Sequence, residues 1–277
     1  MRIKIVLDSS GNLQHLEDVD FSSVPLKILA GDREFVDDET TDVNEMISFL
    51  SEYKGKTGTA CPGVGEYLES FGDAENVYCV TITSNLSGSY NAAQVAARTY
   101  LEQHPERKIH VFDSLSTGGE MVLIAEKIRE LALSGAAFEN VVEQVKAYQA
   151  KTRLLFSLES LHNLVNNGRV PAAVAAVAGM LGIRLIGKAS DVGTLQPIGK
   201  ARGAKKLVPE LYKQLTLIGY KGGKVRIHHC SNPAAAELLK ETILSSYPDA
   251  DIQIGVNGAL CSFYAEKGGL LIGFEIA

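Results

Sequence analysis

Short apolar runs rich in β-branched residues alternate with stretches of helical periodicity through the first half of the chain. In chain order, the predicted elements are a strand at 3–7, a helix at 43–52, a strand at 77–83, a helix at 89–102, a strand at 108–112 and a helix at 117–134. Strands that alternate with helices at this spacing are typical of βαβ units on a mainly parallel sheet. We therefore expect a parallel-sheet α/β domain over residues 1–155.

The second half has a different sequence pattern, in which glycine-rich strand candidates follow short helical stretches. The expected elements are a helical segment at 158–165, an alanine-rich run at 172–180 and strands at 194–198, 224–228, 251–254 and 268–274. This mixture predicts a smaller α+β domain over residues 156–277. No linker composition marks the join near residue 155, so the chain is free to cross between the domains more than once.

The length and charge of the chain exclude several classes of protein. With 277 residues, 45% of them hydrophobic and 22% charged, it is long enough for about two domains with real cores. The formal net charge of −6 and the lack of a Lys/Arg run argue against nucleic acid as a partner. The longest uncharged apolar stretch, 170–183, is shorter than the ~18 residues of a membrane span, and the N-terminal apolar run stops at Asp8, too early for a signal peptide. We expect a cytoplasmic protein without a membrane span.

The cysteines and histidines do not form a recognisable disulfide or metal pattern. The four cysteines are widely spaced, without a C-x-x-C pair or a histidine at ligand spacing; they are Cys61, Cys79, Cys230 and Cys261. The pair His228-His229 has no third ligand in view, so a structural role is preferred over metal binding. We expect four reduced thiols, no metal and no cofactor.

A loop of hydroxyl residues at 83–90 follows a predicted buried strand and opens a predicted helix. It contains Ser87, Gly88 and Ser89, and the free backbone N–H groups at the positive end of a helix favour an anion. A carboxylate or phosphate is the natural ligand of such a site, whereas a serine acting only as a helix N-cap is the structural alternative. The loop lacks G-x-x-x-x-G-K-[ST] and G-x-G-x-x-G, so nucleotide phosphates are not specifically indicated.

A second hydroxyl loop, at 57–63, contains Thr59 and Cys61 and precedes another helical stretch. A catalytic thiol needs a base within hydrogen-bond reach, and no signature ties a histidine to Cys61. The structural alternative is a turn shaped by the proline and glycine that follow the cysteine.

Charged residues at turns and strand ends are further candidates. Asp8 and Asp113 end predicted strands, where they either face a ligand at the carboxyl edge of the sheet or cap a helix. Arg169 follows a glycine at a predicted helix stop and is expected to be exposed, and Arg202 belongs to a basic cluster at 200–206. These arginines are either solvated surface or a docking patch for an acidic partner.

Six short motifs are spread along nearly the whole chain. In chain order they are D-S-S at 8–10, T-A-C-P-G-V-G-E-Y at 59–67, S-N-L-S-G-S-Y at 84–90, V-F-D-S at 111–114, L-H-N-L-V-N-N-G-R-V at 161–170 and K-A-R-G-A-K-K at 200–206. Together they resemble the DegV family of bacterial fatty-acid-binding proteins, which serve as acyl-carrying subunits of fatty acid kinase. Each motif is weak alone, and six in this order are fairly specific.

The resemblance implies that the protein binds one long-chain fatty acid such as palmitate, with the acyl chain in a tunnel at the junction of the two domains. It assigns the fatty-acid carboxylate to Thr59 and Ser87, and we predict that Gly88, Ser89 and Tyr264 support these two ligands. It further implies that a partner kinase docks on Arg169 and Arg202 and phosphorylates the bound carboxylate. The chain itself is then a carrier and not a catalyst.

The chain departs from the family pattern at the head-group positions. Tyr264 stands where the family usually has a histidine; it can donate a hydrogen bond but cannot act as the same acid–base group. Ala60 and Gly63 replace small hydroxyl residues, which removes two potential donors. Two alternatives stay open: a lipid-sensing regulatory protein without kinase coupling, and an enzyme that uses Ser87 or Cys61, although the segment around Ser87 fails the G-x-S-x-G pattern of serine hydrolases.

Overall fold

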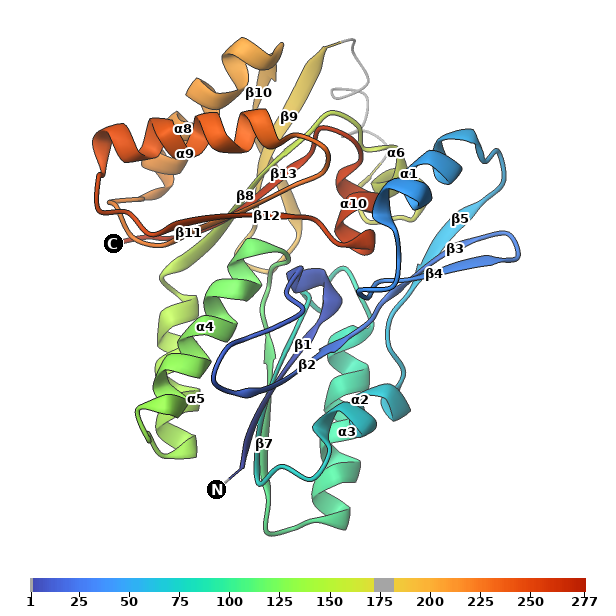
Figure 1. Ribbon diagram of the computed structural model, residues 1–277, viewed down its shortest axis with the longest axis vertical. Helices are drawn as coiled ribbons and strands as arrows, with labels where there is room; N and C mark the ends of the chain where they lie inside the picture. The colour runs from blue at the N-terminus through green and yellow to red at the C-terminus, as the bar shows by residue number, and fades with distance from the viewer. Residues whose placement is uncertain (1, 172–181) are drawn as a thin grey trace.

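The computed structural model describes residues 2–171 and 182–277, and its strands form three sheets. In Figure 1 a four-stranded sheet with its helices forms the lower half, a six-stranded sheet forms the upper half, and a small three-stranded sheet projects to the right. None of the helices within the described ranges is long and apolar enough to cross a membrane.

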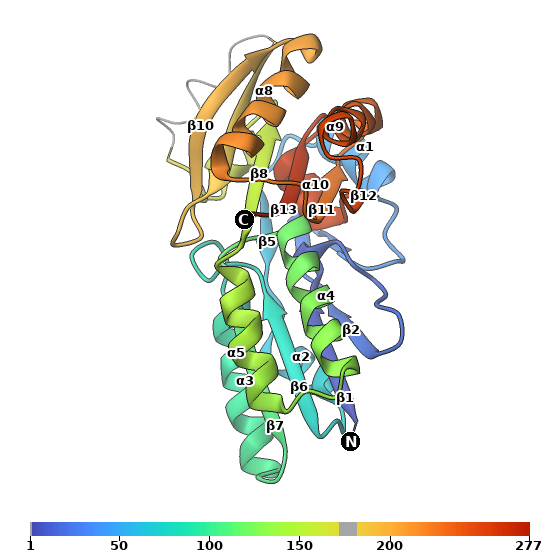
Figure 2. The ribbon, with the colours of Figure 1, turned by 90° about the vertical axis from the view of Figure 1, so that its left-hand side faces the viewer.

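The first half contains the parallel sheet that the alternation of apolar runs and helices predicts. Its strands, in the order β2-β1-β6-β7, are Asp20–Val24, Ile3–Asp8, Asn76–Thr81 and Lys108–Asp113. Its helices are the short 3-10 turn η1 (Ser9–Gly11), α2 (Val64–Phe71), α3 (Ser89–Gln103), α4 (Gly119–Leu133) and α5 (Phe138–Gln149). Figure 2 shows α4 and α5 together at one side of this half.

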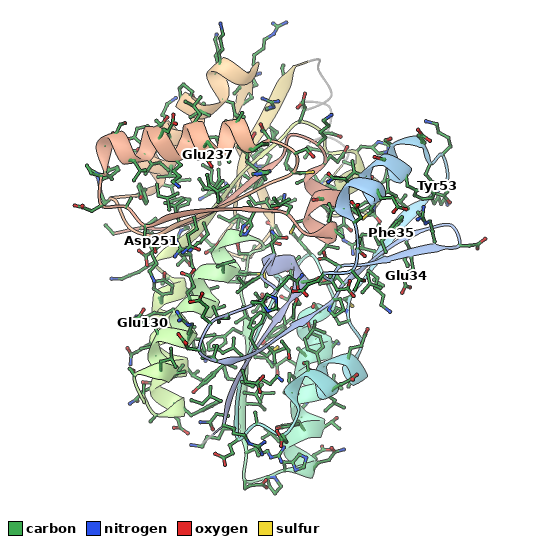
Figure 3. The ribbon with its side chains drawn as sticks, in the orientation of Figure 1. Glu34, Phe35, Tyr53, Glu130, Glu237 and Asp251 are labelled. Carbon is green, nitrogen blue, oxygen red and sulfur yellow. The ribbon has the colours of Figure 1, made fainter. Side chains whose placement is uncertain are left out.

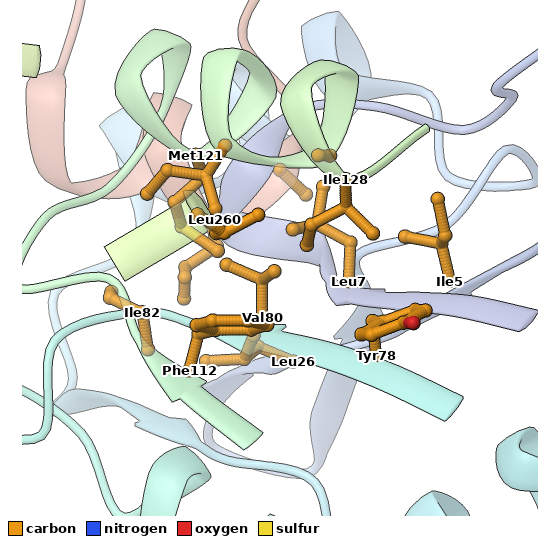
Figure 4. Close-up of a cluster of buried hydrophobic side chains, with 14 of the residues drawn as sticks. Ile5, Leu7, Leu26, Tyr78, Val80, Ile82, Phe112, Met121, Ile128 and Leu260 are labelled. Atoms are coloured by element: carbon orange, nitrogen blue, oxygen red, sulfur yellow. The ribbon is translucent and has the colours of Figure 1, made fainter. Parts of the chain in front are cut away.

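Successive residues of β1 face opposite sides of this sheet, because side chains alternate along a strand. Val6 packs with Tyr67 of α2 in one core cluster, whereas Ile5 and Leu7 pack with Met121 of α4 in another (Figure 4). All five side chains are fully buried. Both faces of the sheet are therefore covered, which is why its strands read as continuous apolar runs.

The segment between β2 and β6 forms an antiparallel sheet that was not predicted from the sequence. Its elements are β3 (Lys27–Ala30), β4 (Arg33–Val36), β5 (Thr57–Ala60) and the predicted helix α1 (Val43–Glu52). The ring of Phe49 on α1 lies 5.7 Å from that of Phe35 and 5.6 Å from that of Tyr53. Figure 3 shows Phe35 and Tyr53 in this projecting part of the molecule. The contact of Phe49 with Phe35 joins α1 to β4 of the small sheet, whereas Tyr53 follows α1 directly.

The second half is built on a six-stranded mixed sheet. In the order β10-β9-β8-β13-β11-β12 its strands are Leu195–Arg202, Ile183–Ala189, Thr152–Leu158, Leu270–Glu275, Val225–His229 and Ile252–Val256. The helices are α6 (His162–Asn166), α8 (Ala204–Ile218), α9 (Pro233–Ser246) and α10 (Ala259–Ala265). Buried side chains of α8 and α9 share one core cluster with this sheet.

Several expectations for this half need correction. The helical segment expected at 158–165 was wrong at its start, because Leu158 closes β8 and α6 covers only His162–Asn166. A short apolar run does not distinguish a strand from a buried helix, which explains the error. The second half, predicted as the smaller α+β domain, contains the six-stranded sheet, and the predicted boundary at residue 155 falls inside β8. We propose that the two domains divide between α5 and β8. The alanine-rich run at 172–180 lies outside the described residues.

The two halves are joined by close backbone contacts and by a return of the chain. At the start of α4, a Cβ atom on Gly119 would lie 2.2 Å from the carbonyl oxygen of Arg226, and one on Gly273 of β13 would lie 2.1 Å from the Glu120 nitrogen. The helix can cross the strands this closely only because both positions are glycine. Later, α10 packs against α1 and β3 of the first half. The chain thus crosses between the halves more than once.

Candidate functional site

A cavity of about 330 Å³ lies where the three sheets meet. Most of its wall is apolar, and the larger apolar side chains that line it are Leu26, Ile82, Leu86, Leu154, Phe156, Leu158, Leu164, Leu195, Leu260 and Leu271. These residues come from both halves of the molecule. The cavity is within the size range of small-molecule binding sites, which are concave and mainly apolar with a few placed polar groups.

Strand β8 supplies one apolar wall through its two-residue periodicity. Leu154, Phe156 and Leu158 line the cavity, whereas the intervening Leu155 packs in the core beneath α8 and α9. On the neighbouring strand, a Cβ atom at Gly187 would lie 2.2 Å from the ring of Phe156. The lack of a side chain at Gly187 therefore allows the Phe156 ring to lie against β9. The alternation of side chains along β8 places the cavity-lining residues on one face of the strand and the core residue Leu155 on the other.

Two hydroxyl groups predicted to bind the head group meet at the polar part of the cavity. The Thr59 Oγ1 on β5 lies 2.7 Å from the Tyr264 hydroxyl on α10, and both residues line the cavity. Burial raises the pKa of Tyr264, while the Thr59 hydrogen bond and the charge of Arg169 act in the opposite direction. Tyr264 is therefore protonated at neutral pH and has a hydroxyl hydrogen to donate.

The loop between β6 and α3 brings Ser87 and Gly88 to the same cavity. The amides of Leu86 and Ser87 both donate to the carbonyl of Thr83, so the loop turns tightly before the helix begins. Ser87 Oγ accepts a hydrogen bond of 3.2 Å from the Ser89 amide, and Gly88 occupies the N-cap without a side-chain cap. The positive end of a fifteen-residue helix thus opens beside the cavity, as the sequence predicts.

Ser89 does not bring its hydroxyl to the cavity, which corrects the expected head-group set. Its buried Oγ donates to Asp8 Oδ2 at 2.7 Å and lies 2.6 Å from the Tyr67 hydroxyl. Asp8 also accepts from the Ile82 amide at 2.8 Å and from Ser10, and burial raises the pKa of its carboxyl group. Ser89 is held inward because this buried carboxyl group needs donors around it.

Arg169, expected to be exposed, is half-buried and lines the cavity. Gly168 adopts a left-handed conformation (φ 71°) after α6, and the chain turns back toward the first half. The Nε of Arg169 donates to the Leu86 carbonyl at 3.1 Å, and its Nη1 donates to the Asn167 carbonyl. Its guanidinium therefore contacts the Ser87 loop and acts electrostatically on Tyr264. The glycine before Arg169 was the one sequence signal for this placement.

The other candidates occupy different positions. Arg202 is exposed at the end of β10 and does not line the cavity, so its docking role stays a prediction. Cys61 is exposed and lines the cavity beside Gly88. The hydrogen bonds described for 2–171 and 182–277 join neither Cys61 nor Ser87 to a histidine. Asp113, at the end of β7, accepts hydrogen bonds from the Ser84 amide in the loop between β6 and α3 and from the Leu115 amide in the loop that follows β7.

His228 and His229 end β11 inside the second half. Burial lowers the pKa of both, to about 4 for His228, so both rings are neutral at physiological pH. Within the described part of the chain, no group of three His, Cys, Asp or Glu side chains is arranged to hold a metal ion.

Two polar residues in the cavity wall were missed by the sequence analysis. Thr117 donates to the Ser10 carbonyl at 3.2 Å, and Cys261 donates to the same carbonyl at 3.3 Å. Burial raises the pKa of Cys261 to about 12, so the thiol is protonated and unreactive at neutral pH. Neither residue belongs to a local motif, since they meet only through tertiary packing.

Comparisons with known proteins identify the family of the chain. The chain matches the model of the DegV family over residues 2–276. A DegV domain-containing protein of Streptococcus pneumoniae is 46% identical over 280 residues, covering 100% of both chains.

Two solved structures are similar over nearly the whole length. The Streptococcus pneumoniae fatty acid kinase (Fak) B3 protein loaded with linoleic acid has a TM-score of 0.98 and 46% identity, with 100% of both chains covered. A DegV family protein from Eubacterium eligens loaded with heptadecanoic acid has a TM-score of 0.97 and 44% identity, covering 99% of this chain and 100% of that chain.

Proposed function

The chain belongs to the DegV family, and from this premise we propose that it binds one long-chain fatty acid in the cavity between its halves and presents the carboxylate to a partner kinase. The observation that carries the proposal is the composition of the cavity wall. A mainly apolar surface is combined with one cluster of donors made by Thr59, Ser87, Tyr264 and Arg169. An apolar chain that ends in a carboxylate fits both parts.

The acyl chain accounts for most of the binding energy in this proposal. Each methylene transferred from water to an apolar environment contributes about 0.8 kcal/mol, so a long chain supplies a large favourable term. Part of it is offset by the lost translational and conformational freedom of the ligand. The leucine-rich walls from β8 and α10 support this role.

The carboxylate needs donors, because burying an unpaired charge costs several kcal/mol. In the proposed arrangement the hydroxyls of Thr59, Ser87 and Tyr264 and the Gly88 N–H donate to it. Arg169 supplies the positive charge, and hydrogen bonds between charged groups are stronger than neutral ones. The earlier assignment of Arg169 to kinase docking is thereby changed to head-group binding.

Tyr264 gives this head-group site a different response to pH from one that contains a histidine. Histidine has an ordinary pKa near 6.5 and changes charge around neutral pH. Burial raises the pKa of Tyr264, so its hydroxyl remains a neutral donor there. We infer that carboxylate binding depends on the guanidinium of Arg169 and not on a titrating imidazole.

Kinase coupling is supported by the similarity to a solved fatty acid kinase B3 protein. We propose that the partner kinase phosphorylates the bound carboxylate and docks near the exposed Arg202, while this chain remains a carrier. A cytoplasmic location is part of the proposal and is supported by four free cysteines.

Native mass spectrometry of the chain as purified from bacterial cells tests the proposed ligand. We expect a mass increase equal to one fatty acid per chain, with the acid identified after organic extraction. A ligand without a carboxylate, or a chain that stays empty after incubation with palmitate and linoleate, would contradict the proposal.

A further inference from the structure

A second and larger hollow lies beside the head-group cavity. Its volume is about 960 Å³, and it is lined by residues of α1, the segment 53–57, α6 and α10. In Figure 1 these elements lie together at the right-hand side of the molecule. We call this hollow the α1–α10 groove. The proposed fatty-acid site does not use it.

The groove and the cavity share three structural walls. Each of β5, α6 and α10 contributes residues to both hollows: Thr57 lines the groove and Thr59 the cavity, Asn163 the groove and Leu164 the cavity, and Phe263 the groove and Tyr264 the cavity. The elements that carry the Thr59–Tyr264 pair therefore form the floor of the groove. A molecule bound in the groove contacts the same elements that hold the fatty-acid head group.

The charges lining the groove are mainly positive, although the whole chain has a net charge of −6. Lys54, Lys56 and Lys267 are exposed, and the ion pairs described for the chain include none of the three. Glu266 is the one acidic residue among the described lining residues, and its Oε1 already accepts from Ser160 Oγ and the Asn163 amide. The three ammonium groups are thus available to an anionic partner.

Apolar side chains complete the groove. Ile47 and Leu50 of α1 line it from one side, Phe263 of α10 lines it from another, and Tyr53 lies at the end of α1. A volume near the upper limit for small-molecule sites, together with a rim of separate lysines, favours a chain segment over a compact ligand. Charge complementarity requires this segment to be acidic.

We propose that the α1–α10 groove docks an acidic, partly apolar segment of the kinase that acts on the bound carboxylate. This inference rests on the proposed function, because the kinase is its partner. The shared elements favour docking here, because a segment in the groove contacts β5 and α10, which carry the head-group hydroxyls of Thr59 and Tyr264. By linkage, docking in the groove and fatty-acid binding then influence each other to the same extent.

The test uses a variant that reverses the three groove charges, Lys54→Glu/Lys56→Glu/Lys267→Glu. A matched control, Lys146→Glu/Lys151→Glu/Lys221→Glu, makes the same change in net charge at exposed lysines outside the groove. Each protein is loaded with palmitate, its loaded fraction is verified by native mass spectrometry, and its affinity for the catalytic subunit of the Streptococcus pneumoniae fatty acid kinase is measured by calorimetry.

We expect the groove variant to bind the kinase about tenfold or more weakly than the control at low salt, with a smaller difference at about 0.5 M salt because exposed charges are screened. Equal affinities of the groove variant and the control would overturn the groove proposal and leave fatty-acid binding and kinase coupling intact. A loaded wild-type chain without affinity for the kinase would overturn kinase coupling and the groove together. A wild-type chain that takes up no fatty acid would contradict the proposed function itself.

Discussion

The hydroxyl of Tyr264 lies 2.7 Å from that of Thr59, although 205 positions separate the two residues in the chain. This contact joins α10 of the second half to β5 of the small sheet, and both residues line the cavity. One of the two hydroxyls must donate to the other when the cavity holds no acceptor. In the presence of a carboxylate, both hydrogens are free to turn toward the ligand.

We expect Tyr264→Phe and Thr59→Val each to weaken fatty-acid binding by about tenfold, because a hydrogen bond to a charged group contributes roughly 1.5–3 kcal/mol. Both substitutions preserve side-chain shape. The measurement is a titration with a fluorescent fatty acid, with Tyr212→Phe on α8 as the control for loss of a tyrosine hydroxyl. Unchanged affinity in both variants would remove these residues from the head-group site.

The double variant Thr59→Ala/Ser87→Ala removes one donor from β5 and one from the loop before α3. We expect it to stay folded, since both side chains are only half-buried, and to bind a fatty acid more weakly than either single variant. A fatty alcohol of equal length should lose less affinity, because it has no charge to stabilise. Circular dichroism checks the fold, and parallel titrations compare the two ligands.

Arg169 and Arg202 are predicted to separate lipid binding from kinase docking. Arg169→Met should reduce affinity for a fatty acid by about tenfold or more but leave that for its methyl ester nearly unchanged, because the guanidinium stabilises charge. Arg202→Glu should leave lipid binding unchanged, because this side chain does not line the cavity, and weaken kinase binding. If Arg169→Met and Arg202→Glu have the same effects, the different roles assigned to these residues are wrong.

Because Gly273 lies against the backbone of α4, we expect alanine to destabilise the protein at Gly273 much more than at Gly65. A Cβ atom at Gly273 would lie 2.1 Å from the Glu120 nitrogen, so Gly273→Ala must displace the helix from β13. We expect a loss of about 3 kcal/mol or more in the free energy of unfolding. Gly65→Ala in α2 is the control, because a Cβ there meets nothing within 4 Å and alanine favours the helix. Urea denaturation of both variants measures the difference.

Glu120 predicts a pH dependence of stability. Burial raises the pKa of this carboxyl group from 4.5 to about 7, against hydrogen bonds from Ser116 and Thr152 that lower it. The folded chain therefore binds a proton that the unfolded chain releases between these pH values, and this contribution to stability is lost as pH rises through 7.

We expect the free energy of unfolding of the wild type, minus that of Glu120→Gln, to fall by about 3 kcal/mol between pH 4 and pH 8. Denaturation at a series of pH values measures this difference. Parallel curves for the two proteins would show that the carboxyl group titrates normally in the folded chain.

The strands and helices of the first half follow from local pattern. The apolar runs that became β1, β6 and β7 are each long enough to be buried on both faces, and α3 and α4 begin within two residues of their expected positions. These elements could be predicted because periodicity and burial act on residues close together in the chain. The small sheet could not, since β3, β4 and β5 have only four residues each and are held by pairing with one another and by the contact of Phe35 with Phe49 of α1.

The head-group candidates show the same division. Hydroxyl loops at a helix start and at a strand end can be recognised locally, and the family motifs indicated that Thr59 and Ser87 belong to one site, to which alignment with the family added Tyr264 as a departure from the usual histidine. That Ser89 turns inward to Asp8, and that Arg169 turns into the cavity instead of toward solvent, depends on partners more than 80 positions away in the chain. A local pattern specifies which groups can donate or carry charge. Only packing between distant segments decides where those groups point, because the buried Asp8 carboxyl group binds the Ser89 hydroxyl and the Leu86 carbonyl binds the Arg169 guanidinium.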